Sequence, residues 1–342
     1  MKRKLLRVTL ALVLGLVFSL VSTGPVVAAD FDVYSGVSIQ SAIDSASDGD
    51  VIYVHEGVYS ENILINGVDV SLIAVGDVTI NGATNGYYDK TIAIYNSVAA
   101  IDGFTVKSNG SSIYARGMGS YGDGEVNVTI KNNYVTDYIK NGITINGELA
   151  TGMVMDNHIV SDTDSVYAQN GVQFGYGASG QVLRNIVDTN WYEGEDWTAS
   201  GILIFESDDV SVKLNNISNA QSGIAIETWG WFVSSASNNK IANNNINNSD
   251  WGVSVVALSW AYSTMDSFAN NNKIVNNVIS SDSEDVGIEG IYIGAYSDPS
   301  DYSPVADNNK AIGNIISGFE TDIVEEGTAT KIHENRIGTP LE

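Results

Sequence analysis

The tryptophans, whose flat faces suit the binding of sugars, are confined to one segment of this sequence. All six tryptophans and a nearby tyrosine fall between positions 191 and 262: Trp191, Trp197, Trp229, Trp231, Trp251, Trp260 and Tyr262. Rigid rings can cover the C–H face of a pyranose at a small cost in side-chain entropy. The segment therefore predicts a sugar-binding groove, and the alternative is that the rings pack beneath their own surface loops.

Acidic side chains share this segment, and two of them form a candidate catalytic pair. Glu227 comes directly before Thr228-Trp229-Gly230-Trp231, and Glu206 lies one repeat unit earlier. Glycoside hydrolases use two carboxyl groups, which lie about 5 Å apart in retaining enzymes and further apart in inverting ones. The carboxyl group whose pKa is raised by burial and by its neighbour serves as the general acid, and the other as nucleophile or base. In so acidic a chain, the competing interpretation is two solvated surface carboxylates.

A recurring sequence pattern sets how these side chains are positioned. Gly-Ile-x-Ile occurs at 142–145, 223–226 and 290–293, and each copy follows a short Asn-rich run. A unit that recurs with insertions of variable length is typical of a solenoid. The second Asn of each run lies at or near positions 133, 157, 185, 216, 245, 277, 314 and 335.

The short apolar segments of each unit predict strands that stack into a parallel β-helix. They are too short to form a helix with a buried face, and β-branched residues dominate them. Stacked coils rise by about 4.8 Å, which places Ile above Ile in the interior and Asn above Asn at the turn. Glu227 follows the inward Ile226, so it is expected to face outward. Glu206 is then a diagonal neighbour at about 5–8 Å.

The N-terminal part of the chain carries the most specific family signal. The segments Ser38–Asp44, Gly49–Val54 and Gly57–Ile63 resemble the short capping helix and first coil of right-handed parallel β-helix proteins in the pectin-lyase-like superfamily. This resemblance covers nearly the whole mature chain. It implies an all-β fold, a single-stranded right-handed parallel β-helix over residues 30–342, with the N-terminal cap and first coil at 30–62. A cap of this kind covers the open end of the core and protects its first strands.

The resemblance leaves the activity open, because the sequence departs from the best-marked enzymes of this fold. It lacks the basic signature of pectate lyases, the Asp-rich motif set of polygalacturonases and the Gln, Asp and Arg pattern of pectin methylesterases. A polysaccharide lyase needs a strong base, and the nearest candidates, Lys213 and Lys240, are expected on a different face. A glycoside hydrolase activity therefore ranks ahead of a lyase activity.

Two functions from different classes follow from these residues. The first is a protein that binds, and as an extension hydrolyses, an extracellular polysaccharide through the aromatic and acidic groove at 191–262. The second is a non-enzymatic cell-surface or matrix solenoid with a structural or adhesive role. The fold alone does not choose between them, because it supports both.

Composition and the first residues predict a place outside the cytoplasm. Residues 1–29 have the charged start, apolar stretch and small residues of a signal peptide, and no second apolar stretch follows that could span a membrane. The formal net charge is −25, so the surface repels nucleic acid and anionic membranes. The expected location is secreted or cell-surface, the expected partner is a polysaccharide or cell-envelope glycan, and the oligomeric state is left open.

Neither a cofactor nor a metal site is expected. The chain has no Cys, and His55, His158 and His333 are far apart in sequence, so a copper site is not predicted. Three oxygen-rich segments, at 162–164, 282–285 and 298–301, could accept calcium, although solvated loops explain them as well.

Overall fold

The computed structural model describes residues 28–82, 89–108, 110–161, 166–194, 197–281, 287–297 and 302–338. Residues 1–27 of the expected signal peptide lie outside the described residues, as do the three oxygen-rich segments at 162–164, 282–285 and 298–301. In the described part of the chain, no helix is long and apolar enough to cross a membrane.

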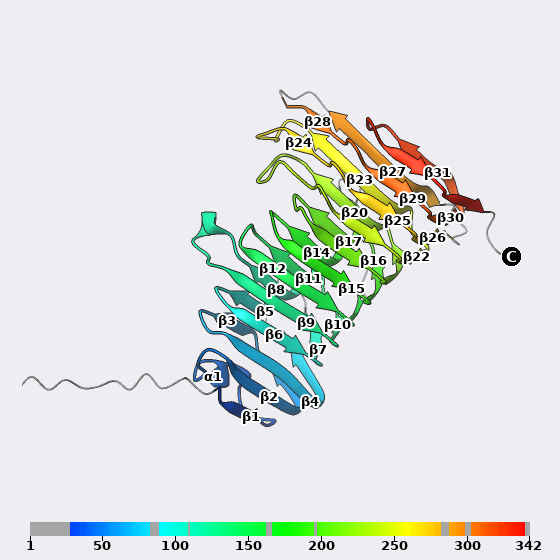
Figure 1. Ribbon diagram of the computed structural model, residues 1–342. Coiled ribbons are helices and arrows are strands. Elements are labelled where there is room, and N and C mark those ends of the chain that lie inside the picture. The colour runs from blue at the N-terminus through cyan, green and yellow to red at the C-terminus, as the bar shows by residue number, and fades with distance from the viewer. Residues whose placement is uncertain are drawn as a thin grey trace, which may run out of the picture.

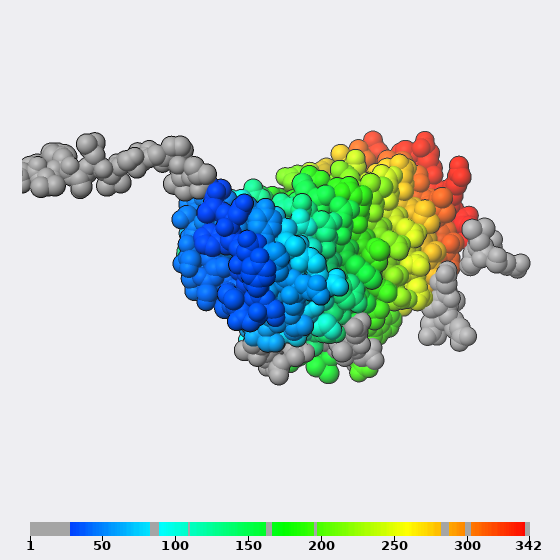
Figure 2. Space-filling model, turned by 90° about the horizontal axis from the view of Figure 1, so that it is seen from below, coloured from blue at the N-terminus to red at the C-terminus, as the bar shows by residue number. Residues whose placement is uncertain are grey.

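The chain winds into a right-handed parallel β-helix whose coils stack in sequence order (Figures 1 and 2). Most coils contribute one strand to a ten-stranded sheet, here called sheet B, and two strands to a 21-stranded sheet, here called sheet A. Short insertions between strands carry the remaining elements. The expected fold class is therefore confirmed.

Sheet B provides the surface on which the candidate site lies. Its strands, in spatial order, are β3 (Ile63–Asn66), β5 (Lys90–Tyr95), β8 (Ser111–Arg116), β11 (Asn141–Asn146), β14 (Asn170–Gly175), β17 (Ser200–Phe205), β20 (Ser222–Thr228), β23 (Trp251–Ser259), β27 (Gly287–Ser297) and β31 (Phe319–Glu325).

Sheet A forms the other sides of the solenoid. Its strands are β1 (Asp30–Val33), β2 (Asp50–Ser60), β4 (Val70–Asn81), β6 (Val98–Asp102), β7 (Thr105–Lys107), β9 (Val126–Lys131), β10 (Tyr134–Thr136), β12 (Ala150–Met155), β13 (His158–Val160), β15 (Ser179–Leu183), β16 (Ile186–Asn190), β18 (Val210–Lys213), β19 (Asn216–Ala220), β21 (Lys240–Ala242), β22 (Asn245–Asn247), β25 (Lys273–Val275), β26 (Val278–Ser280), β29 (Lys310–Ile312), β30 (Ile315–Ser317), β32 (Lys331–His333) and β33 (Arg336–Gly338). A small pair, β24 (Ser267–Phe268) and β28 (Pro304–Val305), joins two insertions.

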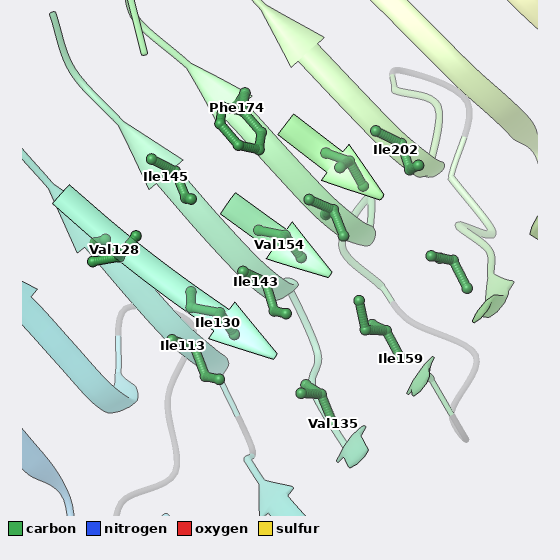
Figure 3. Packing of buried hydrophobic residues seen from close by; sticks show 14 of the residues in the cluster. Ile113, Val128, Ile130, Val135, Ile143, Ile145, Val154, Ile159, Phe174 and Ile202 are labelled. Carbon is green, nitrogen blue, oxygen red and sulfur yellow. The ribbon is translucent and has the colours of Figure 1, made fainter. Parts of the chain in front are cut away.

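The interior is a set of apolar columns that run along the solenoid axis (Figure 3). In sheet B, Ile143 pairs in register with Val172 of the next coil, which pairs with Ile202, and Ile202 pairs with Ile224. All four side chains are completely buried. Both isoleucines of Gly-Ile-x-Ile thus point inward, as the alternation predicts.

The glycine of this pattern is required by close packing between coils. A Cβ atom on Gly223 would lie 2.4 Å from Cγ2 of Ile246 and 2.6 Å from the carbonyl oxygen of Gly252. Any larger side chain would therefore push the backbone of β20 away from β23, which explains why glycine is the second residue of every sheet B strand from β11 to β23.

An asparagine ladder fixes the turn between the two strands of sheet A in each coil. In each step from Asn133 to Asn335, the side-chain oxygen of one Asn accepts the backbone N–H of the Asn one coil earlier, at 2.8–3.0 Å. The members are Asn133, Asn157, Asn185, Asn215, Asn244, Asn277, Asn314 and Asn335. Each side-chain amide completes the link by donating to a main-chain carbonyl, as Asn244 does to Val212 at 3.0 Å.

At two positions the predicted ladder residue lies one residue after the asparagine that forms the ladder. Asn216 and Asn245 are exposed neighbours of the ladder, and they bond to each other through their side chains at 2.8 Å. The ladder residues are instead Asn215 and Asn244, because the residue before each of them, Leu214 or Asn243, adopts the left-handed conformation that makes the turn.

The N-terminal cap lies where the sequence predicts it. Helix α1 (Ile39–Ile43) buries Ile39 and Ile43 against the first coil. Its N-terminus is held by Glu61, whose carboxylate accepts the backbone N–H of Ile39 and the hydroxyl of Ser38, both at 2.8 Å. This contact satisfies donors that the helix itself leaves unpaired.

The ladder yields a matched pair of substitutions. Asn244→Ala removes an acceptor for the backbone N–H of Asn215 and a donor to the carbonyl of Val212, so we expect a loss of about 2–5 kcal/mol in the free energy of unfolding. Asn245→Ala removes one exposed bond and should cost less than about 1 kcal/mol. Urea denaturation of both variants measures the difference, and equal losses would show that the ladder does not anchor the coils.

Candidate functional site

A long groove lies on the outer face of sheet B. Its volume is about 760 Å³, which is in the range of ligand sites. Six neighbouring strands, β5, β8, β11, β14, β17 and β20, contribute to it, and Figure 1 shows them side by side along the solenoid. At about 4.8 Å per step, five steps span about 24 Å, so the groove fits an extended chain better than one small molecule.

The side chains in the groove come from the outward positions of the strands. Parallel register places Arg116, Asn146, Gly175, Phe205 and Glu227 in one column across β8 to β20. A residue at such a position points away from the core, as predicted for the variable residue of Gly-Ile-x-Ile. The groove is therefore built from positions that the repeat leaves free to vary.

Stacked aromatic rings form one end of the groove. The rings of Trp197 and Trp229 stack with centroids 5.1 Å apart, and Trp229 meets the edge of Trp231 at 4.7 Å. Trp260 stacks on Trp231 at 6.0 Å, and Phe205 contacts Trp229 at 5.3 Å. Part of this ring surface is thus consumed by contacts among the rings, as the alternative packing interpretation predicts.

The seven aromatic residues predicted to bind substrate differ in whether they line the groove. Trp197, Trp229 and Trp231 line the groove, and Trp251 lines a smaller adjoining cavity of about 230 Å³. The other three predicted residues, Trp191, Trp260 and Tyr262, line neither cavity. Trp197 is 43% exposed and can offer a ring to a ligand.

Glu227 lies where the aromatic end meets the adjoining cavity. It is near the end of β20, in register with Phe205 and Val256, and it lines both cavities. Burial raises the pKa of its carboxyl group to about 7, and a hydrogen bond from the side chain of Trp229 opposes this rise only in part. Near neutral pH this group can therefore hold or release a proton, as a general acid must.

Glu206 has a contact that the sequence did not predict. Its side chain is completely buried, and its carboxylate accepts the backbone N–H groups of Trp231, Phe232 and Val233 at 2.7, 2.9 and 3.1 Å. Burial raises the pKa of this carboxyl group, although those N–H groups act in the opposite direction. Glu206 does not line the groove; it holds the loop that carries two of the aromatic rings, and its catalytic role stays a prediction.

The opposite end of the groove is cationic, which the sequence interpretation missed. Lys90, Arg116 and Lys140 line it, and the ring of Tyr114 lies 4.7 Å from the Lys90 nitrogen. The basic residues within the tryptophan-rich segment are Lys213 and Lys240, whereas these cations belong to earlier coils. A count of outward positions along the repeat would have placed Arg116 in the column of Glu227.

The two lysines considered from the sequence lie elsewhere. Lys213 in β18 and Lys240 in β21 belong to sheet A, on a different face from the groove, as predicted. Among the described residues, no group of three or more His, Cys, Asp and Glu side chains is close enough to hold a metal ion.

Comparisons with known proteins agree with the fold. The family model described as "Right handed beta helix region" matches residues 90–259. No curated protein matches the sequence. The alginate lyase from Paenibacillus sp. str. FPU-7 is similar in structure, with a TM-score of 0.56 and 13% identity over 90% of this chain and 99% of that one.

Two further solved structures share the architecture. The periplasmic alginate epimerase AlgG has a TM-score of 0.55 and 14% identity, over 92% of this chain and 85% of that one. The complex of XylC with xylose has a TM-score of 0.55 and 11% identity, over 86% of this chain and 70% of that one. This protein therefore has the fold of a right-handed parallel β-helix.

The raised pKa of Glu227 makes stability depend on pH. The folded protein keeps its proton up to a pKa of about 7, whereas the unfolded chain loses it near the ordinary value of 4.5. The contribution of this group is full below pH 4.5 and is lost as pH rises through 7. We expect the free energy of unfolding of the wild type, relative to Glu227→Gln, to fall by about 1–3 kcal/mol from pH 4.5 to pH 8. Parallel curves in urea denaturation across that range would contradict the assignment.

Proposed function

We propose that this protein acts outside the cytoplasm and binds an extended polysaccharide in the groove of sheet B. The observation that carries this proposal is one groove that spans six strands and combines aromatic rings with polar side chains. Sugars need both, because rings cover their C–H faces while polar groups bond to their hydroxyls. The signal-like residues 1–29 support the location.

Solved structures of the same architecture support a carbohydrate ligand. The similar proteins include an alginate lyase, an alginate epimerase and a protein in complex with xylose. Their identity to this chain is low, so they agree with the proposal without identifying the sugar. The ligand class is argued instead from the shape and composition of the groove.

Hydrolysis is an extension of the binding proposal and depends on Glu227. Its carboxyl group, with a pKa of about 7, would protonate the glycosidic oxygen as the C–O bond breaks, and water would supply the group that replaces the leaving sugar. The sequence predicts Glu206 as the second carboxylate of the catalytic pair. Three backbone N–H groups already occupy that carboxylate, so Glu227 is the residue on which we base the extension.

A structural or adhesive role is the second candidate function. Trp231 and Trp260 stack, and Trp229 meets both of them edge to face. An aromatic cluster of this kind stabilises a loop whether or not a ligand binds. This observation favours a solenoid without turnover, and a groove that binds glycan is still compatible with an adhesive role.

Trp197 and Trp191 provide a matched test of binding. Both are tryptophans of one insertion, with side chains 43% and 36% exposed, but only Trp197 lines the groove. Trp197→Ala should weaken retention in polysaccharide-containing gels by about fivefold or more, and Trp191→Ala should leave it unchanged. Equal retention of the two variants would show that the aromatic end of the groove does not bind the polysaccharide.

The hydrolysis extension has its own test. Glu227→Gln should lower turnover of a bound polysaccharide by about 100-fold or more while retention is preserved, because the amide cannot act as an acid. Glu289→Gln is the control, since Glu289 lines only the adjoining cavity. Release of reducing ends measures both variants, and unchanged turnover in Glu227→Gln would end the catalytic assignment.

A further inference from the structure

Four lysines form a single row along one face of the solenoid. They occupy the same position on the successive sheet A strands β21, β25, β29 and β32, and each pairs in parallel register with the next. Figure 1 shows β25 and β29 side by side. At about 4.8 Å per coil, the row is about 14 Å long. We call it the lysine ladder, and its members are Lys240, Lys273, Lys310 and Lys331.

The lysine ladder carries charge that the protein does not neutralise. In earlier coils, cations of sheet A pair with aspartates, as Lys107 does with Asp137 at 3.4 Å and Lys131 with Asp102 at 3.2 Å. No lysine of the ladder forms an ion pair with any described residue. Like charges that lie directly opposite on neighbouring strands are destabilising. The ladder therefore has an electrostatic cost that an external anion would remove.

Acidic residues are absent from the strands around the ladder. The last eight strands of sheet A, from β21 to β33, contain no Asp or Glu, although the chain has 41 acidic residues against 16 basic ones. In the flanking turns, Asp307 bonds to Thr328 and Glu334 pairs with His333. Duplication of the repeat would explain why lysine recurs, but it would not explain why acidic side chains are missing beside it.

The charge of the ladder is arranged as a line. The next outward residues on the central strands β25 and β29 are Val275 and Ile312, which are apolar and partly exposed. A membrane surface is two-dimensional and attracts clusters of basic residues, whereas a single row of charges matches a linear polymer with one negative charge per repeat unit. The apolar residues beside the row can contact the carbon atoms of such a polymer.

The choice of lysine favours phosphate over carboxylate. Arginine recognises planar carboxylate groups through two parallel N–H bonds, whereas lysine binds phosphate as a point charge. A phosphodiester carries one negative charge, and its oxygens surround a tetrahedral phosphorus, so a flexible ammonium group can reach them from several directions. All four cations of the ladder are lysines, and three of them are exposed.

We propose that the lysine ladder binds a linear phosphodiester polymer of the cell envelope, which runs along the solenoid axis and holds the protein at the cell surface. The ladder belongs to sheet A and the groove to sheet B, so a polymer on the ladder leaves the groove free. This inference shares with the proposed function only the location outside the cytoplasm, and it does not depend on what the groove binds.

Two double variants with the same change in net charge isolate the ladder. Lys273→Gln/Lys310→Gln removes its centre, and Lys107→Gln/Lys131→Gln removes two cations of the same sheet that are paired with aspartates. Without ligand, the ladder variant should melt no lower than the wild type, because it relieves repulsion between like charges. This measurement also establishes that the ladder variant folds.

Calorimetry with poly(glycerol phosphate), at low and moderate salt, measures binding. We expect the wild type to bind with an affinity that falls as salt rises. The ladder variant should lose about tenfold or more of that affinity, and the control variant less than about twofold. The polymer should also raise the melting temperature of the wild type and of the control variant, but not that of the ladder variant. Polygalacturonate, phosphatidylglycerol vesicles and neutral dextran are measured alongside.

Four results would overturn the inference. Equal losses in the two double variants would indicate a general ionic layer. Tighter binding of polygalacturonate than of poly(glycerol phosphate) would reject the phosphate ligand. Binding of the vesicles alone, lost in the ladder variant, would make the ladder a membrane contact. Binding of none of these probes would leave the lysines as solvated side chains. The polysaccharide groove is tested separately by Trp197→Ala, so its failure is distinguishable from each of these results.

Discussion

The asparagine ladder is the interaction on which the rest of this structure depends. A parallel β-helix has no covalent device that forces one coil to sit in register on the next, and this chain has no Cys to supply one. Each ladder Asn instead bonds to the equivalent residue of the neighbouring coil through its own side chain, as Asn244 does to Asn277 at 3.0 Å. Because these bonds are buried, a shift of register would leave several polar groups unpaired at once.

Fixed register is what turns a repeat into a binding site. Once Ile lies above Ile inside, the outward positions are also aligned, and residues from distant parts of the sequence share one column. Arg116 and Glu227 belong to the same column although four coil steps separate them. A polymer that lies along the axis therefore meets a different side chain at each step, which is how one sheet can be cationic at one end and aromatic at the other.

The sequence was sufficient for the fold because the fold depends on periodic positions. The alternation in Gly-Ile-x-Ile identified Ile224 and Ile226 as inward and Glu227 as outward, and all three lie as predicted. The ladder was misplaced by one residue at Asn215 because its neighbour Asn216 is also an asparagine. Only backbone conformation separates the two, through the left-handed turn at Leu214.

The site was harder to predict because much of it comes from insertions, which do not follow the repeat. Composition located the tryptophans but could not tell that Trp197 faces the groove while Trp260 packs against Trp231. Nor could composition show that the Glu206 carboxylate binds the backbone of a loop, since that contact depends on how Trp231, Phe232 and Val233 fold back toward it. Lys140 was overlooked because its importance comes from burial beside the groove, which no local pattern records.

The central claim is that a polysaccharide occupies the groove of sheet B, and intrinsic tryptophan fluorescence tests it most directly. Trp197, Trp229 and Trp231 all line the groove, so a bound chain must change their surroundings. Titration with acidic and neutral polysaccharides should give a saturable change in intensity or wavelength with at least one polymer, and Trp197→Ala should reduce its amplitude. A flat response across the whole panel would contradict the account and leave the aromatic cluster as packing within a structural solenoid.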